Sequence, residues 1–161
     1  MGADGKQAEK TVEQQYEELR KKLPLPAFAQ VNADFDLEGL DADSLTVKDV
    51  RKKVSEKLDH AAKLLEEVLQ PDTHIASMYE ARAFDEDEKR VIFSIYRALM
   101  RLYRKDSELS ISSEEAEDAA FIIEVAEFWS RTKGELKKVM RRLQEIWETE
   151  AEQESDLGYM G

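Results

Sequence analysis

The sequence predicts an all-α fold, an antiparallel bundle of five to six helices in a single domain over residues 7–150. Apolar residues recur at the three- and four-residue spacing of amphipathic helices in several successive segments. No segment alternates apolar and polar residues for long enough to form a strand. The chain has 161 residues, of which 42% are hydrophobic, and this is enough to build one buried core without disulfide bonds.

Composition excludes several classes of protein. The chain has no cysteine, 6 glycines and 3 prolines. A disulfide scaffold, a cysteine-ligated metal site, a cysteine nucleophile and a collagen-like or proline-rich chain are therefore excluded. No signal or transit pattern is present at the N-terminus, and no apolar run approaches the ~20 residues of a membrane span. We therefore expect a cytoplasmic protein with no membrane contact.

The first part of the chain predicts a helix followed by an irregular segment. An apolar stripe indicates a helix over residues 7–23, which Pro24 ends. Residues 24–45 lack a helical period and are expected to form an extended strap across the bundle, a wholly disordered tail being the alternative. Residues 1–6 are expected to be disordered and residues 151–161 to form a flexible tail. The stripe consists of Val12, Tyr16, Leu19 and Leu23.

The next helix has a complete start signal. Thr46 is the expected N-cap, and Asp49 occupies the N3 position of a capping box. Leu45 and Val50 occupy the two positions of a hydrophobic staple. The helix is expected to end before Pro71. Its predicted buried stripe is Val47, Val50, Val54, Leu58, Ala61, Leu65 and Val68.

Two further helices are expected after this one. Asp72 or Thr73 caps a short helix, and an acidic cap formed by Asp85 and Glu88 starts a longer helix that ends near Lys105. The longer helix has a wide apolar face and is expected to be the most buried of all. Its predicted inward residues are Ile92, Ile95, Tyr96, Leu99, Leu102 and Tyr103, with Val91 and Ala98 beside them.

Residues 113–150 admit two interpretations. Two capping boxes favour two helices with a break near Gly134. The apolar stripe stays in phase through Gly134, however, and a glycine inside a helix costs only about 1 kcal/mol, which favours one helix. We favour the break. The predicted capping boxes are Ser112 with Glu115 and Thr132 with Glu135.

Aromatic residues are expected in the core rather than on a surface that stacks against bases. A second apolar stripe runs beside the main one within residues 113–150. A helix that is apolar on two sides packs against several neighbours or against a partner, so this pattern predicts self-association or a protein-binding groove. The core aromatics are Trp129, Trp147, Tyr96, Tyr103 and Phe128, and the second stripe is Phe121, Val125 and Phe128.

No constellation typical of an enzyme is present. The HExxH, GxSxG, GxxxxGK[ST] and GxGxxG motifs are absent. The two histidines, His60 and His74, do not follow a glutamate at the spacing found in di-iron bundles. The acidic pairs Asp85–Glu88 and Glu114–Asp118 lie at helix starts, where they complement the helix dipole. We predict no catalytic residue and no cofactor, and we expect a non-enzymatic role.

A short acidic segment resembles the first half of an EF-hand calcium loop. Asp34, Asp36 and Glu38 stand at the oxygen-ligand positions 1, 3 and 5 of that loop, and Gly39 stands at position 6. The resemblance implies a calcium ion held by these three carboxylates. Position 12, where the family has a bidentate glutamate, is Leu45 in this chain.

The adjoining segment Gly39–Leu45 is similar to the prosthetic-group site of acyl carrier proteins. That family has Asp-Ser-Leu at the start of its second helix, and Asp43, Ser44 and Leu45 match these residues. The resemblance implies phosphopantetheine on Ser44, where a helix N-terminus favours a phosphodiester. The helix that follows is longer than the corresponding helix of that family, and the C-terminal hairpin has no counterpart there.

Basic residues gather in two clusters of a chain whose formal net charge is −12. Packed side by side, the two clusters would form one patch for nucleic acid or an acidic protein surface. The alternative is that they complement helix C-termini and pair with nearby acids. The cluster within residues 97–105 is Arg97, Arg101, Arg104 and Lys105. The cluster within residues 131–142 is Arg131, Lys133, Lys137, Lys138, Arg141 and Arg142.

The sequence as a whole favours a non-enzymatic adaptor or regulatory subunit that binds another macromolecule through a helical face. The expected partner is a protein or a second copy of this chain. The first alternative is a nucleic-acid-associated accessory protein that uses the two basic clusters. The second alternative is an acyl-carrier-like protein modified at Ser44.

Overall fold

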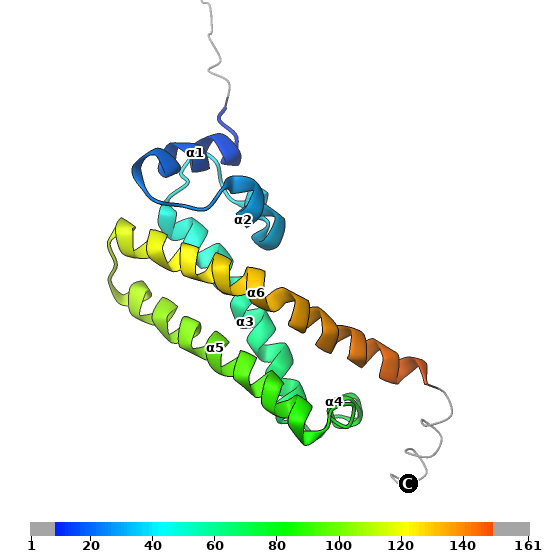
Figure 1. Cartoon of the computed structure of the whole chain (residues 1–161). Helices are drawn as coiled ribbons and strands as arrows, with labels where there is room; N and C mark the ends of the chain where they lie inside the picture. The colour runs from blue at the N-terminus through cyan, green and yellow to red at the C-terminus, as the bar shows by residue number, and fades with distance from the viewer. Residues whose placement is uncertain (1–8, 150–161) are drawn as a thin grey trace, which may run out of the picture. The chain divides into compact units, whose positions relative to one another are not determined.

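The computed structural model describes residues 9–149, and all its regular structure is helical. This confirms the predicted all-α class, and α3 packs against α5 and α6 (Figure 1). The predicted disordered start (1–6) and flexible tail (151–161) lie outside the described residues. The α-helices are α1 (Val12–Lys22), α2 (Phe28–Phe35), α3 (Val47–Leu69), α4 (Ile75–Ala81), α5 (Glu86–Ile111) and α6 (Glu115–Glu148), with a short 3₁₀ helix η1 (Leu37–Gly39) after α2.

The described residues gather into two compact units. The first unit holds residues 9–58 and 102–127, and therefore contains α1, α2 and η1. The second unit holds residues 59–101 and 128–149, and therefore contains α4. The three long helices α3, α5 and α6 each contribute residues to both units.

Helix α1 begins at a reciprocal capping box. The Gln14 amide donates to the Thr11 hydroxyl at 3.2 Å, and the Thr11 amide donates to the Gln14 side chain at 2.9 Å. These two bonds satisfy donors that the first helical turn leaves without partners. The helix therefore begins at Val12, and the predicted helix was wrong for residues 9–11, whereas residues 7 and 8 lie outside the described residues.

Tyr16 fixes the turn that follows α1. Its side chain is fully buried, and its hydroxyl donates to the Pro26 carbonyl at 2.6 Å. Its ring centroid lies 5.4 Å from that of Phe28 on α2. Arg20 holds the same turn, since its Nε donates to the Leu25 carbonyl at 3.2 Å. Burial raises the pKa of the Tyr16 phenol above its ordinary value of 10.0.

The extended strap predicted for residues 24–45 was wrong for residues 28–35, which form α2. Ala27 is the N-cap and supplies no side-chain hydrogen bond, so the sequence carries no start signal here. The helix is held by packing, because Phe28, Val31 and Phe35 are all buried on one face. Asp36 ends α2 in the left-handed conformation, with φ of 53°, and η1 follows.

Helix α3 agrees with the prediction at both ends and along its buried face. The Thr46 amide donates to the Asp49 carboxylate at 2.9 Å, and the Asp49 amide donates to the Thr46 hydroxyl at 3.3 Å. Leu45 and Val50, the staple residues, are buried. All seven residues of the predicted stripe are buried as well: Val47, Val50, Val54, Leu58, Ala61, Leu65 and Val68.

The short helix α4 starts one or two residues later than predicted, since the expected cap was Asp72 or Thr73. His74 is its N-cap, whereas the side chain of Asp72 accepts the Thr73 amide at 2.8 Å outside the helix. The predicted cap of α5 is present, since the Glu88 amide donates to the Asp85 carboxylate at 2.8 Å. The residues that start α4 and α5 are close together in the sequence in both cases, but only α5 has a carboxylate at the capping position.

Helix α5 is longer and more exposed than predicted. It continues past Lys105 to Ile111, and the hydroxyls of Ser107 and Ser110 donate to carbonyls four residues earlier within this extension. The expectation that it is the most buried helix was wrong. Its buried residues are Ile92, Leu99 and Leu102, whereas Val91 is 54% exposed.

Helix α6 runs without interruption through Gly134, so the predicted break was wrong. Leu136 and Val139 beyond the glycine are buried, which shows that the continuous apolar stripe outweighed the local Thr132–Glu135 signal. The predicted Ser112–Glu115 box is also replaced, since the Glu114 amide donates to Glu117 at 3.2 Å at the helix start. The second stripe of Phe121, Val125 and Phe128 is buried within the chain.

Replacing Gly134 with alanine is expected to raise the free energy of unfolding by about 1 kcal/mol, because glycine is the poorer helix former. A Cβ added at Gly134 meets no atom within 4 Å, so it causes no clash. Urea denaturation followed by circular dichroism measures the change. Ala120→Gly, at an exposed position of the same helix, serves as the control and should lower stability by a similar amount. A Gly134→Ala protein no more stable than wild type would contradict a regular helix at this position.

Candidate functional site

Helices α3, α4 and α6 enclose a groove in the second unit, here called the Trp147 groove. Its volume is about 340 Å³. Tertiary packing forms this groove, because its lining residues come from three segments that are far apart in the sequence. The apolar lining residues are Leu64, Val68, Met140, Leu143 and Trp147, and the polar ones are Glu67, Ser77, Glu80 and Gln144.

Trp147 is the largest exposed side chain of this groove. It is 46% exposed, so its predicted place in the core was wrong, as it was for Tyr103 at 39% exposure. One face of the indole is covered by Tyr79 of α4, with ring centroids 4.8 Å apart. The Tyr79 hydroxyl donates to the Ile146 carbonyl at 3.0 Å and holds this arrangement. The indole is therefore oriented by the chain while part of it stays open to solvent.

The rim of the Trp147 groove is acidic. Glu67 on α3 and Glu80 on α4 both line it, and the described lining includes no lysine or arginine. Neither carboxylate has an ion-pair partner within residues 9–149. An apolar floor with an unneutralised acidic rim favours a ligand that is both apolar and positively charged.

The first basic cluster is divided between the two units. Arg97 and Arg101 belong to the second unit, and Arg104 and Lys105 belong to the first. All four are exposed. Lys105 pairs with Glu124 of α6 at 2.5 Å, so part of its charge is already balanced within the chain.

The second basic cluster lies entirely on the second-unit part of α6, and its residues are exposed. Lys138, Arg141 and Arg142 line a groove that also contains three glutamates, Glu88, Glu135 and Glu145. Lys138 pairs with Glu135 at 3.0 Å, and Arg142 Nε donates to the Ala83 carbonyl at 3.2 Å. Charges of both signs thus alternate on this face. The remaining members of the cluster are Arg131, Lys133 and Lys137.

Ser44 lies in an exposed turn before α3. The N-cap of α3 is Thr46, so Ser44 precedes the N-cap by two residues rather than occupying the helix start. Leu45, the third residue of the carrier-like segment, is buried as the staple residue of α3. The serine that the resemblance implicates is therefore accessible but outside the first helical turn.

Of the three residues of the EF-hand resemblance, Asp34 lies in the last turn of α2, Asp36 ends that helix and Glu38 lies in η1. Within residues 9–149, no three His, Asp or Glu side chains are grouped so that they could hold a metal ion. Asp36 and Glu38 are exposed, and Lys57 Nζ donates to the Asp34 carbonyl. His74 lies at the surface with its Nε2 atom 3.7 Å from the Asp72 carboxylate.

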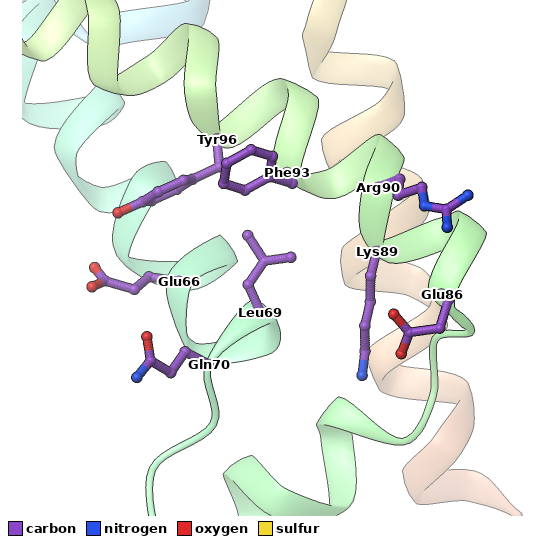
Figure 2. A pocket seen from close by; sticks show the side chains of 8 residues that line it. All are labelled: Glu66, Leu69, Gln70, Glu86, Lys89, Arg90, Phe93 and Tyr96. Carbon is purple, nitrogen blue, oxygen red and sulfur yellow. The ribbon is translucent and has the colours of Figure 1, made fainter.

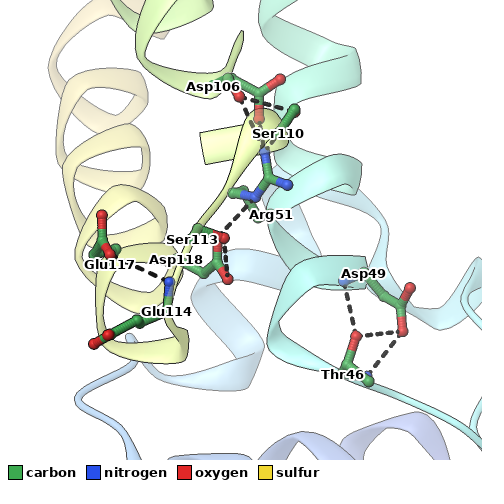
Figure 3. Close-up of polar contacts among 9 residues, drawn as sticks. All are labelled: Thr46, Asp49, Arg51, Asp106, Ser110, Ser113, Glu114, Glu117 and Asp118. Carbon is green, nitrogen blue, oxygen red and sulfur yellow. Dashed lines mark hydrogen bonds and ion pairs between the residues drawn. The ribbon is translucent and has the colours of Figure 1, made fainter. Parts of the chain in front are cut away.

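The first unit contains a buried ionic network that was not predicted from the sequence (Figure 3). Arg51 of α3 is 2% exposed, and its Nε lies 2.9 Å from the carboxylate of the fully buried Asp118 on α6. Its Nη1 also pairs with the Asp106 carboxylate and donates to the Ser110 hydroxyl at 3.1 Å. The Ser113 hydroxyl donates to Asp118 at 2.9 Å.

The position of Arg51 in the sequence does carry a signal for this network. Arg51 stands four residues after Val47 and three before Val54, on the apolar stripe of α3, and Asp118 stands four before the buried Ile122. Ionisable residues at core positions predict a buried pair. The network joins α3, α5 and α6 through buried ion pairs.

None of the helices within residues 9–149 is long and apolar enough to cross a membrane. Comparison with family models, with curated proteins and with solved structures finds no match to this chain.

Proposed function

We propose that this chain is a non-enzymatic helical adaptor whose Trp147 groove binds a basic amphipathic helix of another protein. The observation that carries the proposal is an oriented, 46% exposed tryptophan beside an acidic rim. Tryptophan is among the residues that contribute most to protein–protein interfaces. Because Tyr79 already orients the ring, a partner gains the contact with little loss of conformational freedom.

A helix is the expected form of the ligand. The apolar floor is built from side chains spaced one turn apart on α3 and α6, Leu64 with Val68 and Met140 with Leu143. Such a floor receives apolar residues that repeat every three to four positions on a partner helix. The same mode of binding needs no reacting group, in agreement with the absence of catalytic motifs from the sequence.

The negative charge of the groove rim favours a positively charged partner. Glu67 and Glu80 face the groove, and the whole chain carries a formal net charge of −12. Both the local and the long-range field attract a positively charged partner and accelerate its association. The nucleic-acid alternative has weaker support, because glutamates alternate with the basic residues of α6.

Selection from a library of random helical peptides tests the proposal. The wild-type protein is the bait, and the Trp147→Ala protein removes peptides that bind elsewhere. Enriched sequences are expected to carry Lys or Arg on one face and large apolar residues on the other. Enrichment of acidic peptides, or of the same peptides by both proteins, would refute the assignment.

Direct titration of a selected peptide gives the magnitude. Trp147→Ala and the double charge reversal Glu67→Lys/Glu80→Lys are each expected to weaken binding at least tenfold, which corresponds to about 1.4 kcal/mol. Glu56→Lys, a single charge reversal away from the groove, is the control, because Glu56 is exposed on α3 and lines none of the described grooves. Binding should also weaken as salt is added, since the attraction is partly electrostatic.

A further inference from the structure

A second groove lies between α3 and α5 in the second unit, here called the α3–α5 groove (Figure 2). Its volume is about 580 Å³. None of its lining residues belongs to the Trp147 groove. Its α3 edge is formed by Glu66, Leu69 and Gln70, and its α5 edge by Glu86, Lys89, Arg90, Phe93 and Tyr96.

The centre of the α3–α5 groove is apolar and open. Phe93 is 54% exposed, and its ring centroid lies 6.3 Å from that of Tyr96. Figure 2 shows Leu69 beside these two rings, between the charged side chains of the two edges. An exposed phenylalanine ring beside a half-buried tyrosine is typical of a surface that another protein covers.

The two edges of the groove differ in charge. Glu66 is the one charged residue of the described α3 edge, whereas the α5 edge presents Lys89 and Arg90 together with Glu86. Arg90 is already paired with Asp87 at 3.2 Å. Lys89 and Glu66 have no ion-pair partner within residues 9–149, so each remains available to a group from outside.

We propose that a second copy of this chain covers the α3–α5 groove and forms a twofold-symmetric dimer. In such an interface the same patch serves both copies, so it must be complementary to itself. A twofold axis lying along the groove places the α3 edge of one copy opposite the α5 edge of the other. Glu66 on the α3 edge of each copy then faces the partner's α5 edge, which carries Lys89, and Phe93 of each copy faces the partner's α3 edge, which carries Leu69.

The arrangement of charges selects this axis over the other possible one. An axis running across the groove would place α3 edge against α3 edge, so that the two Glu66 carboxylates would lie on the same side of the interface, which is unfavourable. An unrelated protein would need the reciprocal pattern of charges to fit as well, whereas a second copy carries that pattern by construction.

Sedimentation equilibrium of the full chain over a wide range of concentration tests the dimer. The mass is expected to rise from monomer to dimer, and Phe93→Ala is expected to raise the dissociation constant at least tenfold. Val91→Ala is the matched control, since Val91 is equally exposed at 54% but lines a different groove. A monomer at every concentration, or equal effects of both substitutions, would overturn the proposal.

Charge exchange tests the axis. Glu66→Lys alone and Lys89→Glu alone are each expected to weaken the dimer, whereas the double variant should associate like wild type. An equal mixture of the two single variants should also associate more tightly than either alone, because a lysine then faces a glutamate at both contacts between positions 66 and 89. Failure of the mixture to do so would refute this axis. Trp147→Ala should leave the dimer intact, which separates this test from that of peptide binding.

Discussion

Replacing Arg51 with alanine is expected to lower the free energy of unfolding by about 3–5 kcal/mol, the usual cost of removing one partner from a buried ion pair. The loss is large because Asp118 is fully buried and would keep only the Ser113 hydroxyl as a hydrogen-bond donor among the contacts described. An uncompensated carboxylate in the interior retains its desolvation cost without the attraction that offset it. Urea denaturation followed by circular dichroism measures the change.

Two further variants show whether the cause is the stranded charge. Arg141→Ala removes an exposed arginine of α6 and should change stability by no more than about 0.5 kcal/mol. The double variant Arg51→Met/Asp118→Leu removes both buried charges and should be more stable than Arg51→Ala, since Asp106 is 22% exposed and can be hydrated. If Arg51→Ala cost less than the exposed control, the network would have no structural role.

Replacing Tyr16 with alanine is the second change with a large expected effect. Truncation of a buried aromatic side chain typically costs about 3–5 kcal/mol. Tyr16 is fully buried, and its loss removes both the ring contact with Phe28 and the hydrogen bond to Pro26. The same denaturation experiment measures the loss. A change below that of a typical surface substitution would show that α1 and α2 do not depend on this residue.

The conservative variant Tyr16→Phe separates the hydroxyl from the ring. It keeps the packing and removes one hydrogen bond, so about 1 kcal/mol is the expected loss near neutral pH. Because burial raises the pKa of this phenol above 10.0, the neutral form is favoured by folding, and its stabilising effect is lost as the pH rises above that value. Wild type should therefore lose more stability than Tyr16→Phe between neutral and strongly alkaline pH.

Local sequence determined the helices whose signals lie within a few residues. Thr46 and Asp49 are three positions apart, and the hydrogen bonds between them form as soon as the first turn does. The same holds for Asp85 and Glu88 at the start of α5. The stripe of α3 was readable because every fourth or third residue is apolar over the whole helix.

Weak local signals were overridden by packing. The Thr132–Glu135 box would start a new helix, but a break there would disrupt the regular register of the buried residues Trp129, Leu136 and Val139 on α6. In α2 the local start signal is missing, yet the segment is helical. Burial of three of its apolar residues accounts for this. A cap contributes about 1 kcal/mol, and burying one large apolar side chain contributes more.

Both grooves depend on tertiary structure alone. The lining of the Trp147 groove comes from α3, α4 and α6, and that of the α3–α5 groove from two helices separated by α4. Helical periodicity placed Trp147 on the apolar face of its helix. Whether other helices cover the indole ring depends on how far those neighbouring helices extend. The sequence by itself therefore determined the all-α class, both ends of α3, the start of α5 and the main buried stripe, because these follow from interactions within one or two turns. Only the packing of distant segments decided which apolar and charged side chains remain exposed together.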